Sequence, residues 1–468
     1  MIRIAIFKTK LTPKNITTSL MKKLGVGTYR MTSALHEDLL CKAIECGFSV
    51  IDTSPNYNKG ESELLVGRAL KRCIRQPQVV TKYGFVQGDD LESHQRSPIP
   101  DAVEYTDTCF YSIHPEFMRQ QLSKSLQRMQ VDKVSTYLIH NPEHLLMSLI
   151  PPDVNPSNSL LENARSKLSE RLSEAFVALE QEVDNGRIES YGITSNSFAL
   201  PKDHPHFVPF DIIPSLVDSA RQQLGKNKSN FSTIELPCNV LERTGATPES
   251  LGGNGCAQFC QLHGYEVMIN RSLTAFDETG SWRLADSDFP MAYSGAKDAL
   301  IEHLSPVGEG GMSKEEMIEW NETLEACKWL RTLVNDLDAE VGSFTSVMHY
   351  QDDLQRTIVP MINAKLDGMD DDTSELVFKF FSQYELAVRS VAGQQTRSHV
   401  FESVSKISKL ESNKYFVAPK FPLLVNTAEE PLQEYALQWL NDQPTVSTVL
   451  LGCTQEGYAN QAYKVFNR

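Results

Sequence analysis

Short apolar segments alternate along the chain with segments whose apolar residues recur at helical spacing, such as Leu35, Leu39 and Ala43. This alternation predicts parallel strands covered by helices, in either a doubly wound sheet or a closed barrel. The predicted strands lie at residues 24–29, 48–52, 79–82, 136–140, 191–195, 233–236, 266–270 and 446–452. Eight strands without an early Gly-x-Gly-x-x-Gly sequence favour an α/β fold of the (β/α)8 TIM-barrel class.

A long segment, residues 277–421, interrupts this alternation between the seventh and eighth predicted strands. Apolar stripes such as Leu376, Phe380 and Tyr384 predict that it is mainly helical. The chain then divides into an N-terminal extension (1–23), barrel strands one to seven (24–276), a helical insertion (277–421) and the eighth strand with its flanking helices (422–468). We expect the insertion to cap the carboxyl face of the barrel, or else to be a peripheral or oligomer-forming unit. A shorter, irregular insert is expected at 146–164.

Composition narrows the class of protein. The 468 residues are 41% hydrophobic and 22% charged, which is ordinary globular usage, and no apolar stretch reaches the ~18 residues of a membrane span. A net charge of −15 disfavours nucleic acid as a partner. The nine cysteines show no Cys-x-x-Cys pair and no spacing suited to zinc, so we expect free thiols and no metal.

The N-terminus is basic, with no acidic residue before Glu37, which is typical of an organelle transit peptide. Against this, Ile2, Ile4 and Ile6 alternate as in a strand. We therefore expect a cytoplasmic protein, with a mitochondrial or plastid location as the alternative.

Four polar residues lie at or just after the ends of predicted strands. Asp52 ends the second strand, Lys82 the third and His140 the fourth, while Tyr57 lies in the loop after Asp52. Because the carboxyl ends of barrel strands meet at one face, we expect these four side chains to converge.

These residue types suit proton transfer to a carbonyl oxygen. The Tyr57 phenol, with an ordinary pKa near 10, needs a neighbouring cation to become a better acid. Lys82 can supply that cation and Asp52 can hold it in place, while a neutral His140 can donate a hydrogen bond to the carbonyl or share the proton transfer. No Ser or Cys nucleophile stands in a comparable frame, so covalent hydrolysis is disfavoured. Carbonyl reduction needs a hydride source, which points to a nicotinamide cofactor.

Six runs of sequence resemble the aldo-keto reductase superfamily. They are Leu24–Tyr29, Asp52–Tyr57, Gly60–Glu63, Val80–Lys82, Leu138–Glu143 and Gly186–Asn196. The resemblance covers residues 24–276 and about 425–466 but not the insertion. It implies a (β/α)8 barrel whose acting residues are Asp52, Tyr57, Lys82 and His140.

The resemblance also implies NADP(H) as cofactor, with NAD(H) as the alternative. The positions that match the family's cofactor-binding residues are Gly27, Thr28, Tyr29, Ser195, Asn196, Glu235, Asn270, Arg271, Leu273, Gly452, Thr454 and Gln455. Ser195 and Asn196 match the pair that binds the nicotinamide carboxamide, which a Gln often reaches from the position of Glu235. Many members stack a Tyr on the nicotinamide ring where this chain has Asn270. The basic residue usual after Gly452 is absent, so the choice between NADP and NAD stays open; Lys or Arg from the insertion could supply the charge for a 2′-phosphate.

The favoured function is an NAD(P)(H)-dependent oxidoreductase that interconverts an aldehyde, ketone or sugar lactol with its alcohol or lactone, with Tyr57 as proton donor. The partner would be a small carbonyl or sugar substrate, with neither nucleic acid nor membrane involved and the oligomeric state left open. The alternative is a catalytically idle NAD(P)-binding barrel that acts as a regulatory or structural subunit. His144 is expected on the surface or in a loop.

Overall fold

The computed structural model describes residues 22–151, 154–277, 280–286, 290–305, 314–344, 350, 353–365, 371–411, 431–453 and 456–467. Within these residues, eight parallel strands close a barrel in the order β1-β13-β10-β9-β8-β7-β3-β2. The strands are β1 (Lys23–Gly27), β2 (Val50–Asp52), β3 (Gln78–Tyr83), β7 (Val134–His140), β8 (Ile188–Thr194), β9 (Phe231–Pro237), β10 (Glu266–Asn270) and β13 (Thr448–Leu451). The predicted (β/α)8 TIM-barrel class is confirmed.

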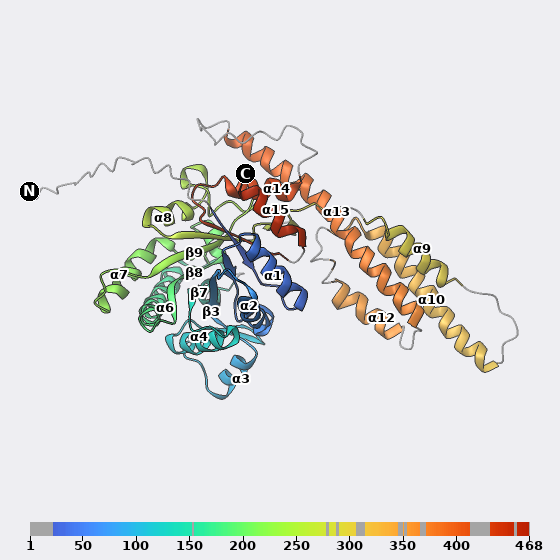
Figure 1. Cartoon of the computed structure of the whole chain (residues 1–468), viewed down its shortest axis with the longest axis horizontal. Coiled ribbons are helices and arrows are strands. Elements are labelled where there is room, and N and C mark those ends of the chain that lie inside the picture. Colours follow the sequence, from blue (N-terminus) through green and yellow to red (C-terminus); the bar gives the residue numbers. More distant parts are fainter. Residues whose placement is uncertain are drawn as a thin grey trace, which may run out of the picture.

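Helices surround the barrel on its outside (Figure 1). They are α1 (Ala34–Cys46), α2 (Glu61–Arg72), α4 (Pro115–Met129), α6 (Asn158–Asp184), α7 (Ile213–Gln223), α8 (Cys256–His263), α14 (Leu432–Asn441) and α15 (Glu456–Phe466). The ends of α1 illustrate how sequence sets such boundaries. The Ser33 side chain accepts a hydrogen bond from the backbone N–H of His36, and Gly47 ends the helix at φ 119°, a left-handed conformation that favours glycine.

Several smaller elements lie between the barrel strands. After β3 the chain forms β4 (Phe85–Val86), α3 (Asp89–Arg96), β5 (Val103–Thr106) and β6 (Cys109–Tyr111), and after β7 it forms α5 (Glu143–Leu149). Strands β4, β6 and β5 make a separate three-stranded sheet. The prediction of an irregular insert at 146–164 is wrong at both ends, because α5 continues to Leu149 and α6 begins at Asn158. The Ser157 side chain accepts a hydrogen bond from the Leu160 N–H and so starts α6 at Asn158.

The mainly helical insertion after β10 begins with a hairpin of β11 (Thr274–Asp277) and β12 (Gly280–Arg283). It continues with α9 (Tyr293–His303), α10 (Lys314–Glu340), the π-helical turn η5 (Leu354–Ile358), α12 (Val359–Lys365) and α13 (Asp371–Glu411). These helices share a hydrophobic core of their own, which includes Leu330, Phe380 and Tyr384. They project away from the barrel (Figure 1), which favours the peripheral alternative over a cap.

The insertion meets the barrel through α13 and the hairpin. Helix α13 packs against β12, and the ring of Trp282 stacks on His399 with centroids 4.2 Å apart. The Arg397 guanidinium bonds to Asp286 at 2.6 Å. Among the described helices, none is both long and apolar enough to cross a membrane.

Substituting Gly192→Ala tests the close approach of β8 and β9. A Cβ atom there would lie 1.9 Å from the backbone oxygen of Thr233, so the two strands must separate. We expect the free energy of unfolding to fall by about 1–3 kcal/mol, measured by urea denaturation. Gly457→Ala is the control, since a Cβ there meets nothing within 4 Å. Equal midpoints for both variants would contradict the strand packing.

Candidate active site at the carboxyl end of the barrel

The barrel interior contains an apolar layer followed by a polar layer. The apolar layer is a small core of Val50, Val80, Leu138, Met268 and Leu450. Because side chains alternate along a strand, the residue two positions further on points into the same interior. Those residues are Asp52, Lys82, His140, Asn270 and Gly452, and the register adds Glu235, which pairs with Met268 across β9 and β10. Strand geometry therefore gathers these residues at the carboxyl end.

Lys82 is fully buried at the centre of this layer. Its Nζ donates hydrogen bonds to Asp52 Oδ1 and, at 3.2 Å, to the Thr53 carbonyl oxygen. A second carboxylate, Glu235, brings Oε2 to 3.7 Å from the same Nζ. A single buried ammonium thus faces two buried carboxylates.

This arrangement shifts the pKa values of Asp52 and Lys82. Burial raises the pKa of Asp52 to about 7, with the charge of Lys82 opposing the rise and that of Glu235 adding to it. Burial alone would lower the pKa of Lys82, but Asp52 and Glu235 outweigh it, and the pKa lies above its ordinary value. Lys82 therefore stays charged at neutral pH.

Tyr57 begins the short helix η1 (Tyr57–Gly60), directly after the end of β2. Its ring centroid lies 5.3 Å from Lys82 Nζ and 6.2 Å from the His140 ring, and it meets the Tyr29 ring edge-on at 5.2 Å. Lys82 favours the phenolate, as the sequence predicts, but the other groups around Tyr57 outweigh it. Burial raises the pKa of Tyr57, and Asp52 and Glu235 add to the rise while Lys82 only opposes it.

His140 ends β7 with its ring edge against Phe85, at 5.0 Å between centroids. Ser54 Oγ lies 3.2 Å from Nδ1. Burial, followed by the nearby Lys82 and His144, lowers the pKa of His140 well below its usual value. The imidazole is therefore neutral at pH 7, as the sequence predicts, and one ring nitrogen is able to donate to a ligand.

The four residues expected to converge do so: Asp52, Tyr57, Lys82 and His140 share one end of the barrel. Most of the expected cofactor positions lie at the same end. Thr28 donates through N and Oγ1 to the Asp52 carbonyl, and Gly27 pairs with Asp52 across β1 and β2. Gly452 directly follows β13, which pairs with β1. Thr454 and Gln455 lie outside the described residues.

Ser195, Asn196 and Arg271 belong to a hydrogen-bonded network beside this layer. The Arg271 guanidinium donates one hydrogen bond to Glu242 Oε1 at 2.8 Å and another to Asn196 Oδ1 at 2.6 Å. The backbone φ of Arg271 is 53°. Leu273 packs on the main core at the start of the hairpin. Glu235 is placed differently from a carboxamide ligand, because Oε1 accepts from Asn270 Nδ2 at 2.7 Å and Oε2 faces Lys82.

Two buried residues were missed or misassigned from the sequence. Glu143 accepts hydrogen bonds from Ser195 Oγ at 2.7 Å and from the Asn196 N–H at 3.0 Å, and burial raises its pKa to about 7. The expectation for His144 is wrong, because α5 buries it against Tyr105 and Tyr111 and burial lowers its pKa to about 4. Only the spacing of Glu143 three residues after His140 could have indicated its position.

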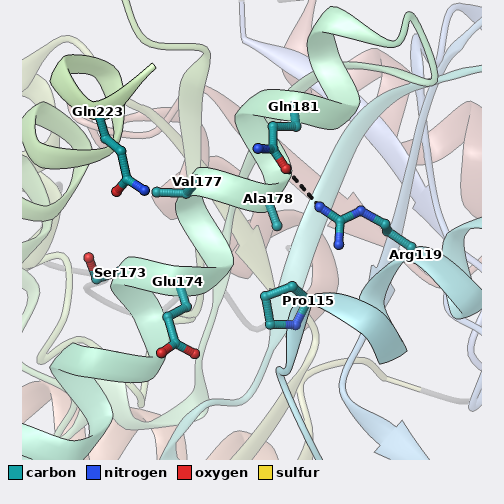
Figure 2. A pocket seen from close by; sticks show the side chains of 8 residues that line it. All are labelled: Pro115, Arg119, Ser173, Glu174, Val177, Ala178, Gln181 and Gln223. Carbon is teal, nitrogen blue, oxygen red and sulfur yellow. Dashed lines mark hydrogen bonds between the residues drawn. The ribbon is translucent and has the colours of Figure 1, made fainter. Parts of the chain in front are cut away.

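Two recesses lie elsewhere on the described residues. One, of about 250 Å³, opens at the amino end of the barrel strands, opposite the polar layer. The other, of about 230 Å³, lies on the outside between α4, α6 and α7, where Arg119 bonds to Gln181 (Figure 2). Neither includes a candidate site residue. The described part of the chain also holds no cluster of three or more His, Cys, Asp or Glu side chains suited to a metal.

Fold and polar layer together define the class: a (β/α)8 barrel with buried ionisable groups at its carboxyl end, where such barrels carry their active sites. The model of the aldo/keto reductase family matches residues 21–366. The chain belongs to the aldo/keto reductase family.

The chain matches only part of the length of its curated relatives. The NADH-specific methylglyoxal reductase of Escherichia coli (strain K12) is 25% identical over 227 residues, 46% of this chain and 61% of that protein. The NAD(P)H-dependent D-xylose reductase of Kluyveromyces lactis is 27% identical over 190 residues, 39% and 51% respectively. The chain thus spans between half and two thirds of these relatives. Among solved structures, an aldo-keto reductase from Bacillus halodurans in its holo form aligns over 97% of this chain and 89% of that chain, at 15% identity and a TM-score of 0.46.

Replacing Lys82 with Met tests the buried charges directly. Asp52 and Glu235 would lose their counter-ion, so we expect the free energy of unfolding to fall by about 3–5 kcal/mol at pH 8. The loss should shrink toward pH 5, because an unpaired buried carboxyl takes up a proton more readily. Urea denaturation at both pH values measures this. Lys23→Met, which removes an exposed ion pair to Glu266, should cost about 1 kcal/mol or less. A loss for Lys82→Met that is the same at both pH values would contradict the pairing.

Proposed function

We propose that this protein is an NAD(P)(H)-dependent oxidoreductase that interconverts a small carbonyl compound and its alcohol. The observation that carries the proposal is the convergence of Asp52, Tyr57, Lys82 and His140 at the carboxyl end of the barrel. The names of relatives, a methylglyoxal reductase and a D-xylose reductase, support aldehydes and sugars as the substrate class.

Each residue has a role that follows from its surroundings. Tyr57 donates its hydroxyl proton to the carbonyl oxygen as negative charge develops there, and His140 donates a hydrogen bond to the same oxygen. The fixed charge of Lys82 stabilises the phenolate that remains, and Asp52 holds the ammonium in place. A reduced nicotinamide, when bound, supplies the hydride.

The polar layer fits a nicotinamide carboxamide. Asn270 Oδ1 is a buried acceptor without a hydrogen bond, and a carboxamide N–H is a donor that would satisfy it. Asn196, held by Arg271 and by the backbone contact to Glu143, offers the complementary amide group. Asn270, Asn196 and Ser195 are therefore the residues that would hold this end of the cofactor.

Arginines from the insertion and from the turn after β1 support NADP(H) over NAD(H). In (β/α)8 barrels a phosphate site commonly lies between the loops after strands seven and eight. Arg283 of β12 lies near Cys453, which follows β13 closely; burial lowers the pKa of Arg283 most, and the charges of Arg389 and Arg30 add to the lowering. Arg283 also bonds to Thr274 at 3.2 Å and Arg389 to Glu385 at 2.5 Å, and guanidinium groups gathered in this way suit a 2′-phosphate in place of the basic residue that is absent after Gly452.

Tyr57→Phe should lower the turnover of a carbonyl substrate at least about 100-fold while the Kd for NADPH stays the same, because only the proton donor is removed. The assay follows reduced-nicotinamide absorbance with a panel of aldehydes and sugars, and cofactor fluorescence gives the Kd. Tyr83→Phe is the matched control, since its hydroxyl is buried without a hydrogen bond and the ring stacks on Tyr137. Cofactor binding without turnover in the unmodified protein would overturn the proposal in favour of the idle barrel.

Arg389→Ala should weaken NADPH binding about tenfold and leave NADH binding unchanged, because NADH has no 2′-phosphate. Fluorescence titration with each cofactor measures both constants. Lys379→Ala removes an exposed cation from the same helix and should change neither constant. Equal losses of affinity for NADPH and NADH would show that Arg389 does not bind the 2′-phosphate.

A further inference from the structure

We propose that Glu235 is a positioning residue of this site: its buried carboxylate shares the single Lys82 ammonium with Asp52 and so controls the proton of Tyr57. The inference rests on the proposed function for its kinetic consequence. Its electrostatic part does not depend on turnover.

The Glu235 carboxylate is buried and held at one of its two oxygens. Glu235 is 1% exposed, and Oε1 is fixed by Asn270 Nδ2 at 2.7 Å. Oε2 accepts no hydrogen bond and lies 3.7 Å from Lys82 Nζ. This oxygen is within range of the ammonium charge but not bonded to it, so it acts on Lys82 as a charge rather than as a ligand.

The groups around Glu235 include more acidic side chains than basic ones. The titratable groups that face Glu235 are Lys82 on β3, Asp52 on β2 and Tyr57 on η1, while β10 contributes only the neutral amide of Asn270. With both carboxyls ionised, one ammonium faces two carboxylates in a buried place. Burying a net charge is unfavourable, so this cluster attracts a proton. The pKa of Asp52, raised by burial to about 7 with Glu235 adding to the rise, is consistent with that.

The same charges act on the Tyr57 hydroxyl. A phenolate would add a further negative charge beside the cluster, and Glu235 disfavours it just as Asp52 does. Reduction requires the phenol, whereas oxidation of the alcohol requires the phenolate as base. Glu235 therefore keeps carbonyl reduction active to a higher pH. Alcohol oxidation likewise begins only at a higher pH.

Glu235→Gln tests this in the full-length protein. With NADPH and a carbonyl substrate, the alkaline limb of kcat/KM for reduction should move down by about one pH unit or more. Glu235→Asp keeps the charge and should retain a limb close to that of the unmodified protein. Glu180→Gln replaces another buried carboxylate, held by Lys226 and Asn230 outside the barrel, and should leave the limb unchanged. A limb that Glu235→Gln does not move, or that Glu180→Gln moves equally, would overturn the inference.

Thermal unfolding of the cofactor-free protein gives a readout without activity. A carboxyl whose pKa is raised on folding lowers stability as pH rises from its ordinary value to its folded value, here from about 4 to about 7 for Asp52. Glu235→Gln removes the charge that adds to the rise of the Asp52 pKa. The Tm of the variant should therefore gain on that of the unmodified protein between pH 5 and pH 8.

Parallel Tm curves over this range would overturn the inference even if the enzyme turns over. Conversely, a protein without carbonyl turnover would contradict the proposed function, and the Tm curves would still decide the role of Glu235.

Discussion

The burial of one ammonium between two carboxylates is the constraint on which the site depends. Lys82 has no exposed surface, and Asp52 and Glu235 are almost as buried. A buried charge without a partner is far more costly than a paired one, so the barrel interior can hold Lys82 only with these carboxylates beside it. The same requirement fixes where Tyr57 sits and how its proton behaves, because its ring lies over the ammonium.

Much of this site could be predicted from the sequence, for a geometric reason. Asp52, Lys82 and His140 each lie two positions after an apolar residue of the barrel interior, so strand periodicity brings them together once the barrel closes. Asn270 obeys the same spacing rule after Met268. Glu235 follows Thr233 and not an apolar residue of that layer, so its place in the interior, its contact with Asn270 and its approach to Lys82 depend on the register of β9 against β10.

Other features could not be predicted, because they depend on burial that a single strand or helix does not reveal. The sequence indicates that Lys82 should favour the Tyr57 phenolate, yet burial and the two carboxylates outweigh that attraction. His144 has no apolar pattern of its own and is buried by the aromatic side chains of β5 and β6. The arginines that act on Arg283 come from segments far apart in the chain, so only the folded structure relates Arg30 and Arg389 to it.

The most direct test of this account is a crystal structure of the protein with NADPH and an unreactive carbonyl ligand. We expect the ligand oxygen within hydrogen-bond distance of the Tyr57 hydroxyl and a His140 ring nitrogen, with Lys82 bonded to Asp52 and close to Glu235 beneath them. A ligand bound elsewhere on the barrel, or a Lys82 side chain turned away from both carboxylates, would contradict it.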